Sequence, residues 1–284
     1  MPNCGGGQCP IGGATEGQIN GGTAQISGLT QTAYACALTL GVNTLDSGKL
    51  SVDHGTLDVC GEIFVGSHGT GGVSITNGGL VSTDVGAEIA SFAGSNGAVT
   101  VDGTNPDGRK STWTVIGGGM YVGGTNTSAG GTGLLTVTNG AQVTAASVYV
   151  YKSGTLTGNT TVSTTNGVTV EGTIEPNWTL TISSDLTFAT QIATMQCNVT
   201  PANLNSVDAE VTGTATLNGR LLVTMTGTFT CGTTYTLLHA TEIRPNTTFS
   251  SVSINFPTGQ NFTPQIIYDY TGNHVYLYLA CNTD

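Results

Sequence analysis

The feature that most constrains this chain is a short segment that returns along the sequence with the same internal pattern. The segment 63–83 returns as 120–145, and 88–103 between them is a looser copy. The matched residues are Phe64-Val65-Gly66 with Tyr121-Val122-Gly123, and Ile75-Thr76-Asn77-Gly78 with Val137-Thr138-Asn139-Gly140. A unit of roughly 20 residues cannot bury its own apolar face, so neighbouring copies must stack on one another.

Within each copy, Val, Ile, Leu or Tyr alternates with Thr or Ser, and Gly or Asn-Gly interrupts the run. This period of two is typical of β-strands with one buried face. Asn-Gly pairs at 77–78, 139–140 and 166–167 supply the positive φ angles that tight corners need. The sequence therefore predicts an all-β solenoid in which about ten rungs, each about 4.8 Å thick, form a rod. A sandwich of β-hairpins is the alternative, because Asn-Gly also favours two-residue hairpin turns.

Composition excludes several classes of partner. Only 8% of the residues are charged, and the net charge is −11 from 17 acidic and 6 basic side chains. Nucleic acids require a basic surface and anionic membranes attract basic segments, so we expect neither as a partner. No run approaches the roughly 20 apolar residues of a membrane span, so we expect no membrane insertion.

We expect three parts along the chain. Residues 1–40 form a Gly- and Cys-rich N-terminal arm and cap, 41–183 carry the solenoid repeats, and 184–284 form a β-rich C-terminal region that closes the solenoid. The arm permits two interpretations. It is either a leader followed by the cap that repeat proteins require, or a strand that pairs with a neighbouring subunit and is locked there through Cys4 or Cys9. Contacts of the second kind do not close, so they produce filaments.

Seven cysteines in a chain with so few charged residues favour an oxidising compartment. No Cys-x-x-Cys pair or nearby histidine has metal-site spacing, so we expect no metal. Cys36 and Cys60 lie about one rung apart and are candidates for a bridge between rungs. Two of Cys197, Cys231 and Cys281 are expected to pair, which leaves the third for a cysteine of the arm. The alternative is a set of buried free thiols.

Candidate catalytic chemistry is sparse. The densest set of acidic residues lies near Lys49 and His54 and consists of Asp46, Asp53, Asp58 and Glu62. Strand alternation would allow Asp46, Asp58 and Glu62 to share one flank of neighbouring rungs. A polysaccharide lyase or hydrolase would need such carboxylates clustered on one face, with Asp58 and Asp102 as the candidates to test. We interpret the set as solvated surface charge, and the loop 102–110 as an inserted turn rather than a calcium site. No nucleotide-binding motif occurs, so we expect no enzymatic activity and no cofactor.

Aromatic residues repeat at a spacing of two in three places. Tyr149 with Tyr151 and Tyr276 with Tyr278 are candidate glycan contacts, and Tyr268 with Tyr270 forms a third pair. Residues i and i+2 of a strand share a face, so each pair would form a small aromatic strip. The alternative is that these rings pack across strands or cap the open end of the solenoid.

At the level of families, the stretch 63–145 resembles the repeats of bacterial autotransporter passengers and of PEP-CTERM-sorted surface proteins. The segments 154–182, 211–242, 248–259 and 266–280 resemble the late rungs and the closing segment of an autotransporter passenger. The resemblance implies a right-handed parallel β-helix that is exported to the bacterial cell surface or beyond.

These observations favour an extracellular structural protein, a fibre or surface-layer subunit that binds copies of itself head to tail through the N-terminal arm. A monomeric surface adhesin or glycan-binding passenger is the alternative. A polysaccharide-degrading enzyme is the third hypothesis.

Overall fold

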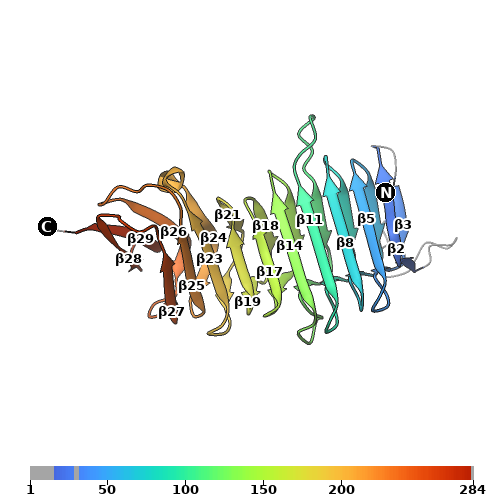
Figure 1. Cartoon of the computed structure of the whole chain (residues 1–284). Helices are drawn as coiled ribbons and strands as arrows, with labels where there is room; N and C mark the ends of the chain where they lie inside the picture. Colours follow the sequence, from blue (N-terminus) through green and yellow to red (C-terminus); the bar gives the residue numbers. More distant parts are fainter. Residues whose placement is uncertain (1–15, 29–31, 283–284) are drawn as a thin grey trace.

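The computed structural model describes residues 16–28 and 32–282. The strands form a rod in which the chain advances from the N-terminal end, blue in Figure 1, to the C-terminal end, red. The parallel β-solenoid predicted from the repeats is confirmed. The alternative sandwich of hairpins is wrong, because strands joined by Asn-Gly corners lie on different faces of the rod.

One face of the rod is a ten-stranded sheet in which every pairing is parallel. Its strands are β2 (Gly21–Ser27), β5 (Ser47–Asp53), β8 (Thr70–Thr76), β11 (Asn96–Asp102), β14 (Thr132–Thr138), β17 (Gly154–Gly158), β20 (Thr173–Pro176), β23 (Thr194–Val199), β25 (Arg220–Met225) and β27 (Ser251–Asn255).

Two further rows of parallel strands form the other faces. The second face contains β3 (Thr32–Ala35), β6 (Thr56–Val59), β9 (Leu80–Thr83), β12 (Thr112–Val115), β15 (Gln142–Ala145), β18 (Thr161–Thr164) and β21 (Leu180–Ile182). The third face contains β1 (Gly17–Ile19), β4 (Leu38–Leu40), β7 (Glu62–Val65), β10 (Gly86–Ile89), β13 (Gly119–Val122), β16 (Ser147–Val150), β19 (Val168–Val170) and β22 (Leu186–Phe188). Both faces continue into the long strands β24 (Val207–Thr216) and β26 (Thr234–Ile243), because β24 pairs with β21 and then with β22.

The core consists of inward-facing columns that run along the rod. In the ten-stranded sheet, one such column contains the buried residues Leu50, Val73, Val99, Leu135, Leu156 and Ile174 in register. Burial of each such side chain contributes about 1.5–3 kcal/mol. The alternation of Val, Ile and Leu with Thr and Ser therefore places one continuous apolar core inside a hydroxyl-rich exterior.

Glycine has a specific role where the third face turns into the ten-stranded sheet. Gly48, Gly71, Gly97, Gly133 and Gly154 lie in register near the start of successive strands. A Cβ atom at any of them would collide with backbone atoms at the end of a third-face strand or in the adjoining corner. The short rung therefore requires glycine at this column.

The Asn-Gly corners behave as predicted at two of three places. Asn77 and Asn139 have φ angles of 51° and 54°, and the glycine after each also has a positive φ. At the third corner only Gly167, with φ of 96°, is left-handed. These corners connect the ten-stranded sheet to the second face, or the second face to the third.

The C-terminal end of the rod changes from parallel to antiparallel pairing. The cap hairpin, β28 (Phe262–Asp269) and β29 (His274–Cys281), follows the long strands, and β29 lies antiparallel to β26. A short 3₁₀ helix, η1 (Pro201–Asn205), precedes β24. No helix in the described part of the chain meets the length and hydrophobicity that a membrane span requires.

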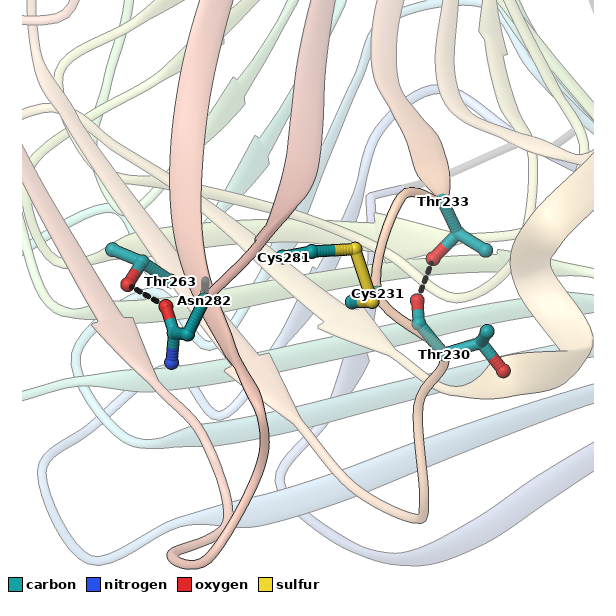
Figure 2. Close-up of a disulfide and its surroundings, with 6 residues drawn as sticks. All are labelled: Thr230, Cys231, Thr233, Thr263, Cys281 and Asn282. Carbon is teal, nitrogen blue, oxygen red and sulfur yellow. Dashed lines mark hydrogen bonds between the residues drawn. A yellow bond between two sulfur atoms is a disulfide. The ribbon is translucent and has the colours of Figure 1, made fainter. Parts of the chain in front are cut away.

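A disulfide joins the last strand to the loop before β26. Cys231 and Cys281 are bonded, and Figure 2 shows the bond between the two segments, with Thr233 donating to the carbonyl of Thr230 and Thr263 to the side chain of Asn282. The bond therefore fastens the cap hairpin to the solenoid.

Candidate functional site

The most distinctive surface of the described residues is the outward side of the third face. In register along the rod lie Gln18, Thr39, Phe64, Glu88, Tyr121, Tyr149 and Thr169. The matched residues Phe64 and Tyr121 of the two sequence copies thus belong to one column. With Tyr149, they place three aromatic side chains in this column.

The first predicted glycan strip lies on this face. The rings of Tyr149 and Tyr151 are 4.4 Å apart, and the Tyr149 hydroxyl donates to Glu171 at 2.8 Å. Burial is the largest cause that raises the pKa of Tyr149 to about 12, and the bond to Glu171 adds to it. Tyr151 is 9% exposed. The strip is therefore packed and hydrogen-bonded, which favours the alternative interpretation of cross-strand packing.

Two carboxylates occupy neighbouring rungs of the same face. Glu88 is buried, and burial is the main cause that raises its pKa, with a smaller contribution from the charge of Glu62. Burial also raises the pKa of Glu62. The backbone N–H of Asn126 donates to Glu88 at 3.4 Å, so the loop after β13 contacts Glu88. Glu88 lies two residues out of register with Glu62, and it is too buried to reach a polymer substrate.

A pocket of about 520 Å³ opens over the first three strands of the third face. Thr39 and Phe64 form its floor, and His68 and Phe92 lie in its wall. The two wall rings are stacked with their centroids 4.3 Å apart, and Phe92 is 45% exposed. Among the residues that the structure describes, no Asp, Glu, Lys or Arg lines the pocket. The lining is thus largely uncharged and partly aromatic, and the pocket is open to solvent.

The wall of the pocket is built from three stacked corners, 41–46, 66–69 and 90–95. The backbone N–H of His68 donates to the carbonyl of Gly41 at 3.1 Å, and that of Phe92 donates to Ser67 at 3.2 Å. Asn43 is held by Asp46, which accepts from its backbone and side-chain N–H groups at 2.9 Å each. These bonds order the corners without using the outer ring faces.

The acidic residues singled out in the sequence do not form a cluster. Asp46 lies in the corner 41–46, Asp58 on the second face and Glu62 on the third, so the expected shared flank is absent. Asp58 accepts from Ser82 at 2.8 Å and lines a separate hollow of about 340 Å³. Asp53 accepts from Asn77 at 2.7 Å.

Asp102 repeats the role of Asp53 two rungs further along the rod. It accepts from Thr138 at 2.6 Å and from the side chain of Asn139 at 2.7 Å. Both aspartates therefore hold an Asn-Gly corner. The loop 103–111 forms an inserted turn in which Asn105 accepts from the backbone of Arg109 at 2.7 Å. Across the described residues, no group of three His, Cys, Asp or Glu side chains has the geometry of a metal site.

A row of titratable residues crosses the C-terminal strands. Glu210, His239, His274 and Asp269 lie in register on β24, β26, β29 and β28. His239 contacts Glu210 at 2.7 Å, and its ring stacks on His274 at 4.4 Å. Tyr276 stacks on His274 at 4.9 Å. Burial and the nearby His239 lower the pKa of His274.

The other tyrosines of the predicted C-terminal strips also lie against residues of this chain. Tyr278 lies in register between Thr234 and Gln265. The Tyr268 hydroxyl accepts from the backbone of Phe249, and the Tyr270 hydroxyl donates to the carbonyl of Thr247. Tyr268 and Tyr270 therefore join the cap hairpin to the segment before β27.

The cysteines follow the prediction in part. The expected pair within the last third is Cys231 with Cys281. Cys36 and Cys60 are both disulfide-bonded and follow strands that pair in register; a bridge between the two stays a prediction. Cys4 and Cys9 lie outside the described residues, and so does the proposed locking of the arm.

Cys197 departs from the expectation that it bonds to the arm. It is a free thiol and is fully buried on β23. It lies near Asp208, which is 3% exposed and has one carboxyl oxygen with no hydrogen-bond partner. Burial raises the pKa of Asp208 to about 7, with the nearby thiol acting in the opposite direction. Among the cysteines that the structure describes, the free thiol is therefore internal.

The two ends of the ten-stranded sheet form a second candidate site. Among the described residues, β2 pairs only with β5, and β27 pairs only with β25. Val252 and Ile254 of β27 lie over the buried Leu221 and Val223, yet Val252 is 42% exposed. It occupies a core position that no further rung covers.

Comparison with known proteins finds no match among family models, curated proteins or solved structures. The resemblance to bacterial surface passengers therefore stays a prediction.

Sequence reasoning missed the wall rings of the pocket. His68 and Phe92 are 24 residues apart in the chain, and each follows a third-face strand at its corner. The signal that could have found them is the alignment of the copies themselves, which places residues 66–69 and 90–95 at equivalent corners.

Proposed function

We propose that this chain is an extracellular structural subunit that stacks end to end through the two edges of its ten-stranded sheet. The observation that carries the proposal concerns β2 and β27, which lie at opposite ends of one continuous parallel sheet and each have one edge that no strand of the described residues pairs. Because every strand of the sheet runs in the same direction, β2 of a second copy can extend β27 in the existing pattern.

The composition of both strands supports this pairing. Edge strands are usually protected by lysine, proline or inward charge, but β2 reads GGTAQIS and β27 reads SVSIN, with no charge or proline in either. The cap hairpin instead closes the second and third faces, and its outer strand carries Pro264, which cannot donate to a further strand. Growth is therefore directed to one sheet.

The contact is head to tail, so it does not close and would produce a filament. β27 has only five residues, so strand pairing alone is a small contact, and we expect assembly to depend on concentration. The Cys231–Cys281 bond supports an oxidising compartment such as the cell exterior. Asp53 and Asp102 accept hydrogen bonds from the Asn-Gly corners. This structural use of the two carboxylates supports a non-catalytic role.

The test is negative-stain microscopy and light scattering of the full chain over a range of concentrations. Val252→Lys places a charge at the open core position and should leave monodisperse rods. Ser253→Gln, a neutral change on the outward side of the same strand, is the control and should still assemble. Filaments that persist in Val252→Lys would refute edge stacking. Filaments that are lost when Cys4 and Cys9 are replaced by serine would transfer the role to the arm, and monodisperse wild-type rods would favour the monomeric adhesin.

A further inference from the structure

The pocket over the first strands of the third face lies on a different face from the ten-stranded sheet whose edges are proposed to stack. It combines three properties that rarely occur together on this exterior. Its wall carries a stacked aromatic pair, its rim carries amide and hydroxyl groups, and its described lining has no Asp, Glu, Lys or Arg side chain.

We propose that this pocket binds a neutral saccharide. The aliphatic C–H face of a pyranose ring packs on an aromatic ring, and its hydroxyls exchange hydrogen bonds with uncharged polar groups. Phe92 offers the exposed ring, and Phe64 lies across the pocket on the floor. Gln18, Thr39 and Asn43 supply amides and a hydroxyl around them.

The polar groups are held in place before any ligand arrives. Asp46 accepts both N–H groups that Asn43 offers it, which leaves the Asn43 side-chain oxygen as an acceptor. The Ser67 hydroxyl contacts Nδ1 of His68 at 3.2 Å, which leaves Nε2 for a ligand. The corners themselves are joined by backbone hydrogen bonds. A preorganised site loses less entropy on binding.

Size and charge narrow the ligand class. A volume of about 520 Å³ falls within the range of small-molecule sites, which is roughly 300–1,000 Å³, and it suits one or two sugar rings of a longer chain. A net charge of −11 disfavours acidic polysaccharides. The packed Tyr149–Tyr151 strip is not part of this site, so the glycan contact moves from the predicted tyrosines to Phe92 and Phe64.

The experiment is affinity electrophoresis of the full chain in native gels that contain dextran, a mixed-linkage glucan or galactomannan, with alginate and polygalacturonate as acidic probes. At least one neutral polymer should retard the chain, and neither acidic polymer should. Phe92→Ala should weaken that retardation by about tenfold or more, a loss of one decade in affinity. Phe256→Ala, which removes a ring of similar exposure at the other end of the rod, should change it by less than about twofold.

A second variant guards against an indirect effect. Thr39→Trp fills the pocket floor and should also abolish retardation while the thermal unfolding curve stays that of the wild type. All variants are also measured in the Val252→Lys background, so that loss of stacking and loss of binding are separate results. The proposal is overturned if no neutral polymer retards the chain, if an acidic polymer is preferred, or if Phe92→Ala and Phe256→Ala behave alike.

Discussion

Replacement of Asp208 by asparagine should remove a large part of the pH dependence of folding. The pKa of Asp208 is raised to about 7 from an ordinary value of 3.8, mainly by burial. Since each decade of proton affinity corresponds to about 1.4 kcal/mol, the folded chain holds this proton about 4 kcal/mol more tightly than the unfolded chain.

The direction of the pH effect follows from the raised pKa. The folded state binds more protons than the unfolded state between pH 4 and pH 7, so this contribution is fully present below pH 3.8 and is lost as the pH rises through about 7. The amide that replaces the carboxyl in Asp208→Asn does not titrate. The free energy of unfolding of the wild type relative to Asp208→Asn should therefore fall by about 4 kcal/mol between pH 4 and pH 8.

The assay is guanidinium unfolding of both chains at several pH values, with the difference between them taken at each pH so that the other carboxylates cancel. Asp107→Asn, in the exposed turn 103–111, is the control and should keep the steep dependence of the wild type. A difference that varies by less than about 1 kcal/mol over this range would refute the burial of the Asp208 carboxyl.

Three further outcomes can be measured by thermal or denaturant unfolding. Gly71→Ala should destabilise the chain by about 2 kcal/mol or more, because the new Cβ would collide with backbone atoms. Gly72→Ala, on the outer side of the same strand, should cost less than about 0.5 kcal/mol, and equal effects of the two substitutions would contradict the packing of this glycine column. His274 has a lowered pKa, so its protonation opposes folding, and the free energy of unfolding should fall as the pH drops below about 6.5. An equal fall of the free energy of unfolding in His274→Asn over the same pH range would contradict this. Loss of the Cys231–Cys281 bond, which closes a 50-residue loop, should cost about 2–4 kcal/mol, and an unchanged Cys281→Ser chain would show that the cap is held without it.

The fold could be predicted from the sequence because strand alternation and Asn-Gly corners are visible within short segments of the chain. The Asn-Gly corners at 77–78 and 139–140 are where the pattern predicts them, and Phe64 and Tyr121 share one column. The required glycines could also have been found, since each follows Ser, Thr or Asn at the start of an alternating run.

The sites were less accessible because rung length is irregular. Paired residues are 18 apart between Thr155 and Thr173 but 36 apart between Asn96 and Thr132. No fixed period therefore places His68 beside Phe92. At the C-terminal end the pairing becomes antiparallel. The contact of His239 with His274 therefore depends on a reversal of chain direction that the repeat pattern does not predict.

The positions of the few charges connect the fold to the proposed assembly. Asp53 and Asp102 hold corners, Glu171 holds a tyrosine, and Glu210 holds His239 at the cap hairpin. These carboxylates lie along the sides of the rod or at its closed faces, and none is on β2 or β27. Charge on an edge strand normally opposes pairing. The absence of charge from β2 and β27 in a chain with 8% charged residues is therefore what the proposed extension of the ten-stranded sheet requires.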